Sequence, residues 1–454
     1  MQGKEKLNRR NFIKTSFAAG AVGTGIFNTE SMKIEPVRQS EDIKIKDYRI
    51  LGRTGFRISD ISFGAGSLTE PALIDRALKM GVNYIDTGEH YMNGQSETAV
   101  GRALKNHDRR SIFLTTKLNI NVIVRDAPQT KEQIKTRFMN CLERLQTDYV
   151  DCLMMHMTPK LTEITHEGFH EAYRELKSEG KVRFFGLSNH GREHSMAGPT
   201  EDSMENVILS AADDGRFDVA LFVYNFLQKE QGEKILRKCR EKNMGTTLMK
   251  MNPVNFYKSS LETGERIEQM KKEGRELPEF YEKIYPKLLK EYENRLNDAE
   301  SFKEKYGLAA DDEIGDAAIK FCLSNLDVHA VCPTPTNFDE LNSFIALSGQ
   351  TLTEPEGSML LDYENMFGRY YCRHACGLCH SACPHEVPVN TIMRYNHYFD
   401  AQGREKHAMR HYANLRTQNA QNCRDCTGHC EKMCPYGVPV QSLLIYAHNN
   451  LSLA

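Results

Sequence analysis

The residues of this chain best suited to chemistry are eight cysteines that follow residue 370. Of the thirteen cysteines, these eight form two runs: Cys372, Cys376, Cys379, Cys383 and Cys423, Cys426, Cys430, Cys434. Each run ends in Cys-Pro, and the sequence at this end is similar in the two runs, CPHEVPV and CPYGVPV. The offset between the first cysteines of the runs equals that between the last, which indicates an internal duplication. Cysteines grouped in this way predict a metal module rather than a disulfide framework.

Three closely spaced cysteines with a more distant Cys-Pro are typical of [4Fe–4S] ligation, in which the fourth ligand comes from the partner motif. Each run contains one gap of three residues where two is usual. The residue pattern of the spacer between the runs predicts helices at 389–398 and 404–418. The segment therefore resembles an α-helical ferredoxin domain with two [4Fe–4S] clusters. The resemblance implies one cluster on Cys372, Cys376, Cys379 and Cys434, and another on Cys423, Cys426, Cys430 and Cys383.

Two zinc sites are the competing interpretation, because four sulfurs also suit tetrahedral Zn²⁺. Zinc motifs more often consist of separated CxxC pairs than of four cysteines closed by a proline, so we favour iron–sulfur clusters. His374, His380 and His429 lie among the cysteines, but each run already supplies four sulfurs. The five remaining cysteines lie in apolar stretches and are predicted to be small core residues. They are Cys141, Cys152, Cys239, Cys322 and Cys332.

A second set of reactive residues lies in the first half of the chain. Asp86, Lys117 and His156 each end a predicted strand, and Tyr91 follows in the loop after Asp86. Reduction of a carbonyl by hydride requires a proton for the developing alkoxide. A free phenol has a pKa near 10, so a neighbouring ammonium is needed to stabilise its phenolate. Singly, these residues are explained as a helix N-cap, a surface lysine and a core histidine; together at matched strand ends they predict an active site.

The same region resembles the aldo-keto reductase family over about three hundred residues. The matching stretches are LGRTGFRIS at 51–59, IDTGEHY at 85–91, TTKL at 115–118, LMMH at 153–156 and GLSN at 186–189. The resemblance implies that Tyr91 is the acid/base, that Lys117 tunes it and that Asp86 pairs with Lys117. It also implies that His156 orients the substrate, and that Ser188 and Asn189 bind the nicotinamide carboxamide of NAD(P).

Several positions depart from the family pattern. Met92 and Asn93 lengthen the loop after Tyr91, and Leu221 stands where a glutamine usually contacts the nicotinamide. The end of the seventh predicted strand, 248–251, has no tyrosine to stack on the ring. The segment 333–340 lacks the Lys or Arg that would pair with a 2′-phosphate. NAD(P) is therefore a candidate cofactor, without a predicted preference for NADPH.

Short apolar runs alternate with amphipathic segments from Tyr48 to Leu347, as in repeated βα units. Eight strands are predicted, at 61–64, 82–86, 112–117, 149–156, 182–188, 217–224, 245–249 and 330–333. Helices are predicted between them, for example at 71–80, 131–145 and 169–179. This favours an α/β fold, a closed (β/α)8 TIM barrel, over an open doubly wound sheet. The latter would usually carry a third glycine after Gly64-Ala65-Gly66.

The organisation of the whole chain follows from these patterns. We predict a barrel at 45–350 and a small, mainly α-helical iron–sulfur domain at 360–454. A charged insertion at 252–306, with exposed helix at 282–305, interrupts the barrel after its seventh strand. It is interpreted as a lid, as a support for the cysteine module, or as a solvated helical hairpin.

The N-terminal residues 1–35 are predicted to be an export signal and linker. Asn8 to Lys14 reads NRRNFIK and is followed by a weakly apolar run, which resembles a twin-arginine signal and implies export, with the periplasm as the expected compartment. The alternative is a basic, disordered N-terminus, with the protein in the cytoplasm if the signal is not used. That pathway carries folded proteins, and cysteine clusters are assembled where thiols are kept reduced. No stretch is long and apolar enough to predict a membrane span. The net charge of −2 gives no electrostatic case for nucleic-acid binding.

The two reactive sets lead to three hypotheses. The first is an oxidoreductase that interconverts carbonyl and alcohol groups of a small molecule, with clusters that exchange electrons with a redox partner protein. The second is an electron-transfer protein whose barrel is catalytically inactive. The third is a reductase with purely structural clusters.

Overall fold

The computed structural model describes most of the chain after residue 42. The described residues are 43–119, 129–158, 160–191, 202–254, 269, 272–274, 286–308, 312–400 and 404–452. The predicted export signal at 1–35 and much of the predicted insertion lie outside them. The chain from Ile43 onward forms one compact unit. No helix within the described ranges has both the length and the apolarity needed to cross a bilayer.

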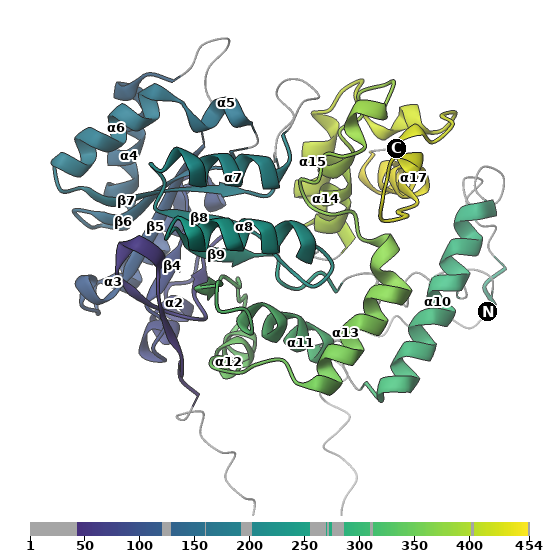
Figure 1. Cartoon of the computed structure of the whole chain (residues 1–454), viewed down its shortest axis with the longest axis horizontal. Helices are drawn as coiled ribbons and strands as arrows, with labels where there is room; N and C mark the ends of the chain where they lie inside the picture. Colours follow the sequence, from purple (N-terminus) through teal and green to yellow (C-terminus); the bar gives the residue numbers. More distant parts are fainter. Residues whose placement is uncertain are drawn as a thin grey trace, which may run out of the picture. The chain divides into compact units, whose positions relative to one another are not determined.

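Eight parallel strands form the centre of this unit (Figure 1). They are β3 (Phe63–Gly64), β4 (Tyr84–Asp86), β5 (Phe113–Asn119), β6 (Val150–His156), β7 (Val182–Asn189), β8 (Val219–Val223), β9 (Gly245–Met249) and β10 (Ala330–Val331). Each strand pairs with the next in sequence. Ile61 pairs with Val331, and the Gly64 N–H donates to the Pro333 carbonyl at 2.8 Å, which joins the first strand to the last. The predicted (β/α)8 barrel is therefore confirmed, with strand bounds shifted by a few residues.

The strands are rich in apolar side chains and are buried on both faces. Every residue of β5, β6 and β8 is buried, as expected for parallel strands covered by helices. The covering helices are α2 (Pro71–Lys79), α3 (Gln95–Leu104), α4 (Lys131–Leu145), α6 (Glu167–Ser178), α7 (Met204–Asp214), α8 (Lys229–Glu241), α11 (Asp312–Leu323) and α12 (Phe338–Ala346). Helix α4 begins where predicted because Thr130 and Gln133 form a capping box.

A short antiparallel hairpin precedes the barrel and was not predicted. It pairs β1 (Tyr48–Ile50) with β2 (Arg57–Ser59), and the turn uses Gly55 in the left-handed region at φ 68°. The Arg53 N–H donates to the Asn243 carbonyl at 2.7 Å, just before β9 begins. The hairpin therefore lies at the N-terminal ends of the strands, which leaves the opposite rim for chemistry.

The described part of the insertion is a long helix, α10 (Pro286–Tyr306), close to the predicted helix at 282–305. Its Phe302 packs edge-on against Tyr363 and Phe367 of α13 (Glu354–Phe367), with ring centroids 5.8 and 5.9 Å apart. Helix α13 leads directly to the first cysteine run. This packing shows that α10 contacts α13, and the role of the insertion stays a prediction.

The cysteine segment is helical, in agreement with the predicted secondary structure. Its elements are α14 (Val389–Asp400), α15 (Glu405–Ala413), α16 (His429–Lys432) and α17 (Val440–Leu451), joined by turns (Figure 1). Buried Ile392, Tyr395 and Leu444 belong to a core that is separate from the core of the barrel. Helix α15 ends earlier than the predicted 404–418, and Arg416 adopts a left-handed conformation at φ 49° after it.

The cysteine segment is fastened to the C-terminal rim of the barrel. Gln228, in the loop after β8, donates to the His374 carbonyl at 2.8 Å and accepts from the His374 N–H at 2.9 Å. The Asn225 amide donates to the Tyr371 hydroxyl at 3.1 Å. Gln228 and Asn225 follow the C-terminal end of β8, so the first cysteine run lies at the end of the barrel that also carries Asp86, Lys117 and His156.

Candidate active site

Lys117 is the centre of a polar cluster at the C-terminal rim. Lys117 lies on β5 and is fully buried, and its ammonium donates to the Asp86 carboxylate at the end of β4. The same Nζ donates to the Thr87 carbonyl at 2.7 Å and to the Tyr91 hydroxyl at 3.3 Å. Tyr91 is half-buried in the loop after β4, so its hydroxyl joins the buried ion pair to the mouth of the barrel.

The electrostatics of this cluster keep a positive charge beside the phenol. Burial lowers the pKa of Lys117, but the Asp86 carboxylate and the Tyr91 phenol raise it, and the net pKa lies above its ordinary value. Burial raises the pKa of Asp86, and the Lys117 ammonium opposes that rise. A retained ammonium next to Tyr91 favours the phenolate form, which is the tuning that an acid/base tyrosine requires.

His156 ends β6 and completes the set of four. It is 3% exposed, and its ring meets the Tyr91 ring edge-on with centroids 5.4 Å apart and planes at 84°. The structure thus brings together Asp86, Tyr91, Lys117 and His156, which come from three neighbouring strands. Their meeting follows from the parallel sheet, since the carboxyl ends of its strands share one rim.

Ser188 and Asn189 lie at the end of β7, also on this rim, and both are buried. The Ser188 hydroxyl accepts from the Met157 N–H at 3.1 Å. The Asn189 amide donates to the Thr158 carbonyl at 2.7 Å and accepts from the Gly191 N–H at 2.9 Å. These bonds hold the loop after β6 in place. The predicted contact of both residues with a nicotinamide carboxamide stays a prediction.

An ion pair that the sequence did not reveal anchors the loop of Tyr91. Glu89 accepts from Arg137 of α4, with Nε at 3.1 Å from Oε2, and from the Asn119 N–H at 3.0 Å. The Glu89 N–H in turn donates to the Lys117 carbonyl at 3.1 Å. Asn93, two residues after Tyr91 in the same loop, adopts a left-handed conformation at φ 56°. The Glu89–Arg137 pair therefore positions Tyr91 against Lys117.

We expect Arg137→Met to lower the turnover number by roughly 10-fold, because small displacements of a catalytic group are costly. Steady-state kinetics on an aldehyde substrate measures the effect, with Lys135→Met on the same helix as the matched control. Arg137→Lys should recover part of the lost turnover, whereas a purely structural defect would lower the melting temperature instead. Unchanged turnover in folded Arg137→Met would contradict a positioning role.

Cysteines of the two runs lie near one another in the structure. Burial raises the pKa of Cys379 to about 12, and the charges that raise it further come from cysteines of both runs. The electrostatic neighbours of Cys372 and Cys376 include Cys434, from the other run. Burial likewise raises the pKa of Cys423 to about 12 and of Cys430 to about 11, and Cys383 from the first run is among the neighbours of both. The largest of the charges that act on Cys379 is that of Cys430, which belongs to the other predicted ligand set, so the crosswise ligand sets stay a prediction.

The donor chemistry around these sulfurs fits a cysteine-ligated cluster. The Asn390 amide donates to Cys372 Sγ at 3.1 Å, and the Val387 N–H donates to Cys383 Sγ at 3.4 Å. Hydrogen bonds of this kind set the potentials of iron–sulfur clusters. In the described ranges, no three His, Cys, Asp or Glu side chains are arranged to hold a single metal ion. Ligation of two [4Fe–4S] clusters by these cysteines therefore stays a prediction.

The scattered cysteines behave differently from the clustered ones. Cys141, Cys152, Cys239 and Cys322 are buried in the barrel, as predicted for core residues. Cys332 follows β10 and is only half-buried. Burial raises its pKa to about 12, and the nearby Asp86 carboxylate adds to the rise. It packs against the inner core of the barrel, as predicted, and also borders the polar cluster.

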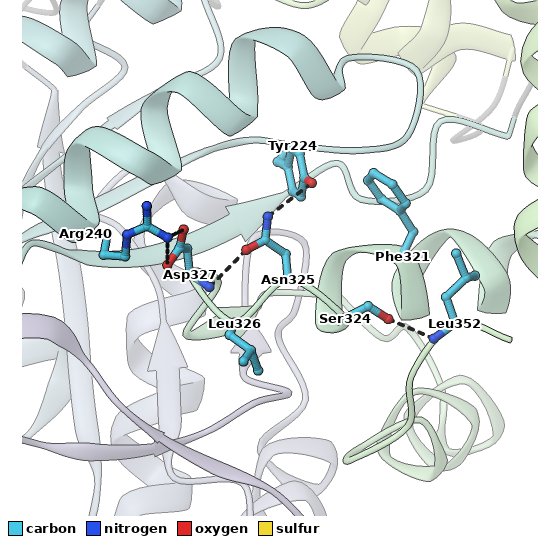
Figure 2. Close-up of a pocket in the computed structure, with 8 residues that line it drawn as sticks. All are labelled: Tyr224, Arg240, Phe321, Ser324, Asn325, Leu326, Asp327 and Leu352. Atoms are coloured by element: carbon cyan, nitrogen blue, oxygen red, sulfur yellow. Dashed lines mark hydrogen bonds and ion pairs between the residues drawn. The ribbon is translucent and has the colours of Figure 1, made fainter.

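A hollow of about 580 Å³ lies elsewhere on the barrel, between α8, α11 and the loop before β10 (Figure 2). Asn325 donates to the Tyr224 hydroxyl there at 3.4 Å, and Arg240 pairs with Asp327 at 3.0 Å. The loop before β10 belongs to the N-terminal ends of the strands. This hollow is therefore separate from the rim that carries Tyr91 and Lys117.

Comparison with known proteins places these observations in a family. The sequence model described as "Aldo/keto reductase family" matches residues 67–360, which is well over half of the chain and ends before the first cysteine run. The chain is 28% identical over 278 residues to "Aldo-keto reductase YhdN" of Bacillus subtilis, across 58% of this chain and 77% of that protein. It is 34% identical over 152 residues to "Uncharacterized oxidoreductase YqkF" of the same organism, across 31% of this chain and 48% of that protein.

Among solved structures, the chain is similar to the holo form of aldo-keto reductase AKR11C1 from Bacillus halodurans. The sequence identity is 24% and the TM-score is 0.49, over 70% of this chain and 95% of that one. The family match itself covers β4 to β10, the strands that carry the polar cluster. The chain belongs to the aldo/keto reductase family and is an oxidoreductase.

Proposed function

We propose that this oxidoreductase interconverts carbonyl and alcohol groups of a small molecule at Tyr91, and that it exchanges electrons through two [4Fe–4S] clusters. The observation that carries the first part is the contact of the Tyr91 hydroxyl with the buried Lys117–Asp86 pair. The second part is supported by the number and spacing of the eight cysteines and by the attachment of the first cysteine run to the same rim.

The proton chemistry belongs to the chain's own residues. The Tyr91 hydroxyl donates its proton to the oxygen that develops from the carbonyl, and the Lys117 ammonium stabilises the phenolate that remains. Asp86 holds Lys117 in place, and His156 orients the carbonyl oxygen from the other side of Tyr91. NAD(P), when bound, would supply or accept the hydride. Ser188 and Asn189 are the residues proposed to contact its carboxamide.

We propose crosswise ligand sets, in which each cluster takes three cysteines from one run and the last cysteine from the other run. Cys372, Cys376, Cys379 and Cys434 would hold one, and Cys423, Cys426, Cys430 and Cys383 the other. A [4Fe–4S] cluster carries single electrons, at a potential that the protein sets through charge, hydrogen bonds and exposure. Gln228 and Asn225 fasten the cysteine segment to the catalytic rim, which supports coupling between the two halves rather than a purely structural role.

We further propose that the protein is exported through the twin-arginine pathway and meets a redox partner protein there, with the periplasm as the expected compartment. Export is supported by the sequence NRRNFIK at 8–14 and by the need to assemble clusters before export. The sequence departs from the family pattern at Leu221 and at 333–340. The alternative proposal is therefore a barrel that no longer accepts hydride from soluble NAD(P).

Anaerobic titration tests the coupling. The purified protein is mixed with NADH, NADPH, or an alcohol substrate with oxidised cofactor, while the visible absorbance and electron paramagnetic resonance of the clusters are followed. We expect reduction of the clusters together with turnover of aldehydes or ketones. Turnover that continues undiminished after cluster removal would contradict coupling and make the clusters structural. Cluster reduction by an external donor without any carbonyl turnover would contradict catalysis by the barrel.

A further inference from the structure

A narrow cavity of about 50 Å³ lies beside Cys372, where the cysteine segment meets the insertion. Its lining includes Arg394 and His397 of α14, His374 from the first cysteine run, and Arg295 of α10. None of these residues belongs to the Tyr91 cluster or to the proposed sulfur ligands. The cavity is therefore an additional feature of the fold.

Arg394 is the unusual member of this lining. Its side chain is only 1% exposed, and its Nη1 donates to the His190 carbonyl at 2.7 Å. Its Nε and Nη2 are buried and meet no hydrogen-bond acceptor among the described residues. A buried guanidinium with two unused donors is costly, since buried charges are normally paired. The geometry calls for an acceptor that carries negative charge.

The surroundings of Arg394 are rich in positive charge. Arg295 is 3% exposed and stacks on the Tyr370 ring with Cζ 4.5 Å from its centroid. Lys250, which follows β9, lies over the Tyr398 ring at 5.0 Å. Burial and then the charge of Lys250 lower the pKa of His397 to about 3, so this imidazole is neutral at pH 7.

One carboxylate, Asp400, also lines the described cavity. Its oxygens accept from the Asn396 amide at 2.9 Å and from the Asn450 amide at 3.4 Å. Apart from Cys372, the charged groups of the described lining are two arginines and one aspartate, which leaves an excess of positive charge. The cavity therefore favours an anion.

The location relates this cavity to catalysis. His190, whose carbonyl accepts from Arg394, directly follows Asn189 at the end of β7. Lys250 directly follows the end of β9. Both strand ends belong to the rim that carries Tyr91, Lys117 and His156. An anion held by Arg394 would thus lie on the catalytic side of the barrel.

We propose that Arg394 binds a carboxylate or phosphate group carried by the substrate, so that the enzyme acts on anionic carbonyl or alcohol compounds. This inference rests on the proposed function. The cavity is far smaller than the roughly 300–1,000 Å³ of sites that enclose a whole ligand. It therefore takes one oxyanion group, while the reacting carbon lies outside it near Tyr91. A guanidinium suits either group, because its fork of N–H donors matches both.

Direct binding tests the site without any need for turnover. Calorimetric titration with inorganic phosphate and with acetate, in buffer free of chloride, compares the wild type with Arg394→Gln and Arg394→Lys. We expect roughly 10- to 100-fold weaker binding in Arg394→Gln, and a smaller loss in Arg394→Lys, which keeps the charge. Arg404→Gln, in the same segment but not in the cavity lining, is the matched control and should bind as the wild type does. Circular dichroism confirms that each variant is folded.

Kinetics with matched substrate pairs tests the link to catalysis and separates the two anion sources. The pairs are succinic semialdehyde with butanal, and glyceraldehyde 3-phosphate with glyceraldehyde. A higher kcat/KM for one charged member, lost in Arg394→Gln but kept in Arg404→Gln, would support the proposal and identify the group. Equal kcat/KM within both pairs, or anion binding that is unchanged in Arg394→Gln, would overturn it. Binding that depends on Arg394 in a protein that turns over no carbonyl would instead refute the proposed function.

Discussion

Replacing Tyr91 with phenylalanine is expected to lower carbonyl turnover by roughly 10²- to 10⁴-fold, the usual contribution of a positioned acid or base. The hydroxyl is the atom that contacts Lys117 Nζ, at 3.3 Å, so the substitution removes the proton donor and leaves the ring that packs against His156. Substrate affinity should change far less than the turnover number. Steady-state kinetics on an aldehyde panel measures both.

Tyr306→Phe is the matched control for that experiment. Its hydroxyl bonds to Asp362 on α13, away from the catalytic rim, so the same chemical change should leave turnover intact. Full activity in Tyr91→Phe would exclude this residue as the acid and direct attention to His156. A loss of activity in both variants would indicate a general defect in folding.

The second large effect concerns the crosswise cysteine sets. The wild type should contain about eight irons and an equal amount of acid-labile sulfide per chain, as two [4Fe–4S] clusters require. The double variant Cys372→Ala/Cys434→Ala should keep about half of this iron, because both cysteines belong to one proposed cluster. Cys372→Ala/Cys383→Ala should lose nearly all of it, because these cysteines belong to different ones. Sequential ligation within each run would give the opposite result.

Metal and sulfide analysis after anaerobic purification measures these outcomes, with electron paramagnetic resonance to identify the cluster type. Cys239→Ala, which changes a buried barrel cysteine, is the control and should keep all of the iron. A colourless wild type that contains zinc instead of iron would show that the cluster assignment is wrong. Cys434 lies near Cys372 and Cys376, and Cys383 lies near Cys423 and Cys430, but Cys379 also lies near Cys430, so the iron content decides between the crosswise and sequential sets.

The sequence alone determined the architecture of the barrel and the members of its polar cluster. Runs of buried apolar residues specify parallel strands locally, and the C-terminal ends of such strands must share one rim. The sequence therefore predicts that Asp86, Lys117 and His156 lie together. The duplicated Cys-Pro runs can likewise be recognised from the sequence, because the spacing of their cysteines is a local property of the chain.

Only the tertiary structure showed what surrounds these residues. Arg394 and His190 are 204 residues apart in sequence, and Gln228 and His374 are 146 apart, yet each pair shares a hydrogen bond. The Glu89–Arg137 pair that anchors Tyr91 likewise joins a loop to a helix. Periodicity and spacing report on neighbours along the chain. They carry no information about which distant side chains burial will bring together, and so the anchoring pair and the Arg394 cavity became visible only in three dimensions.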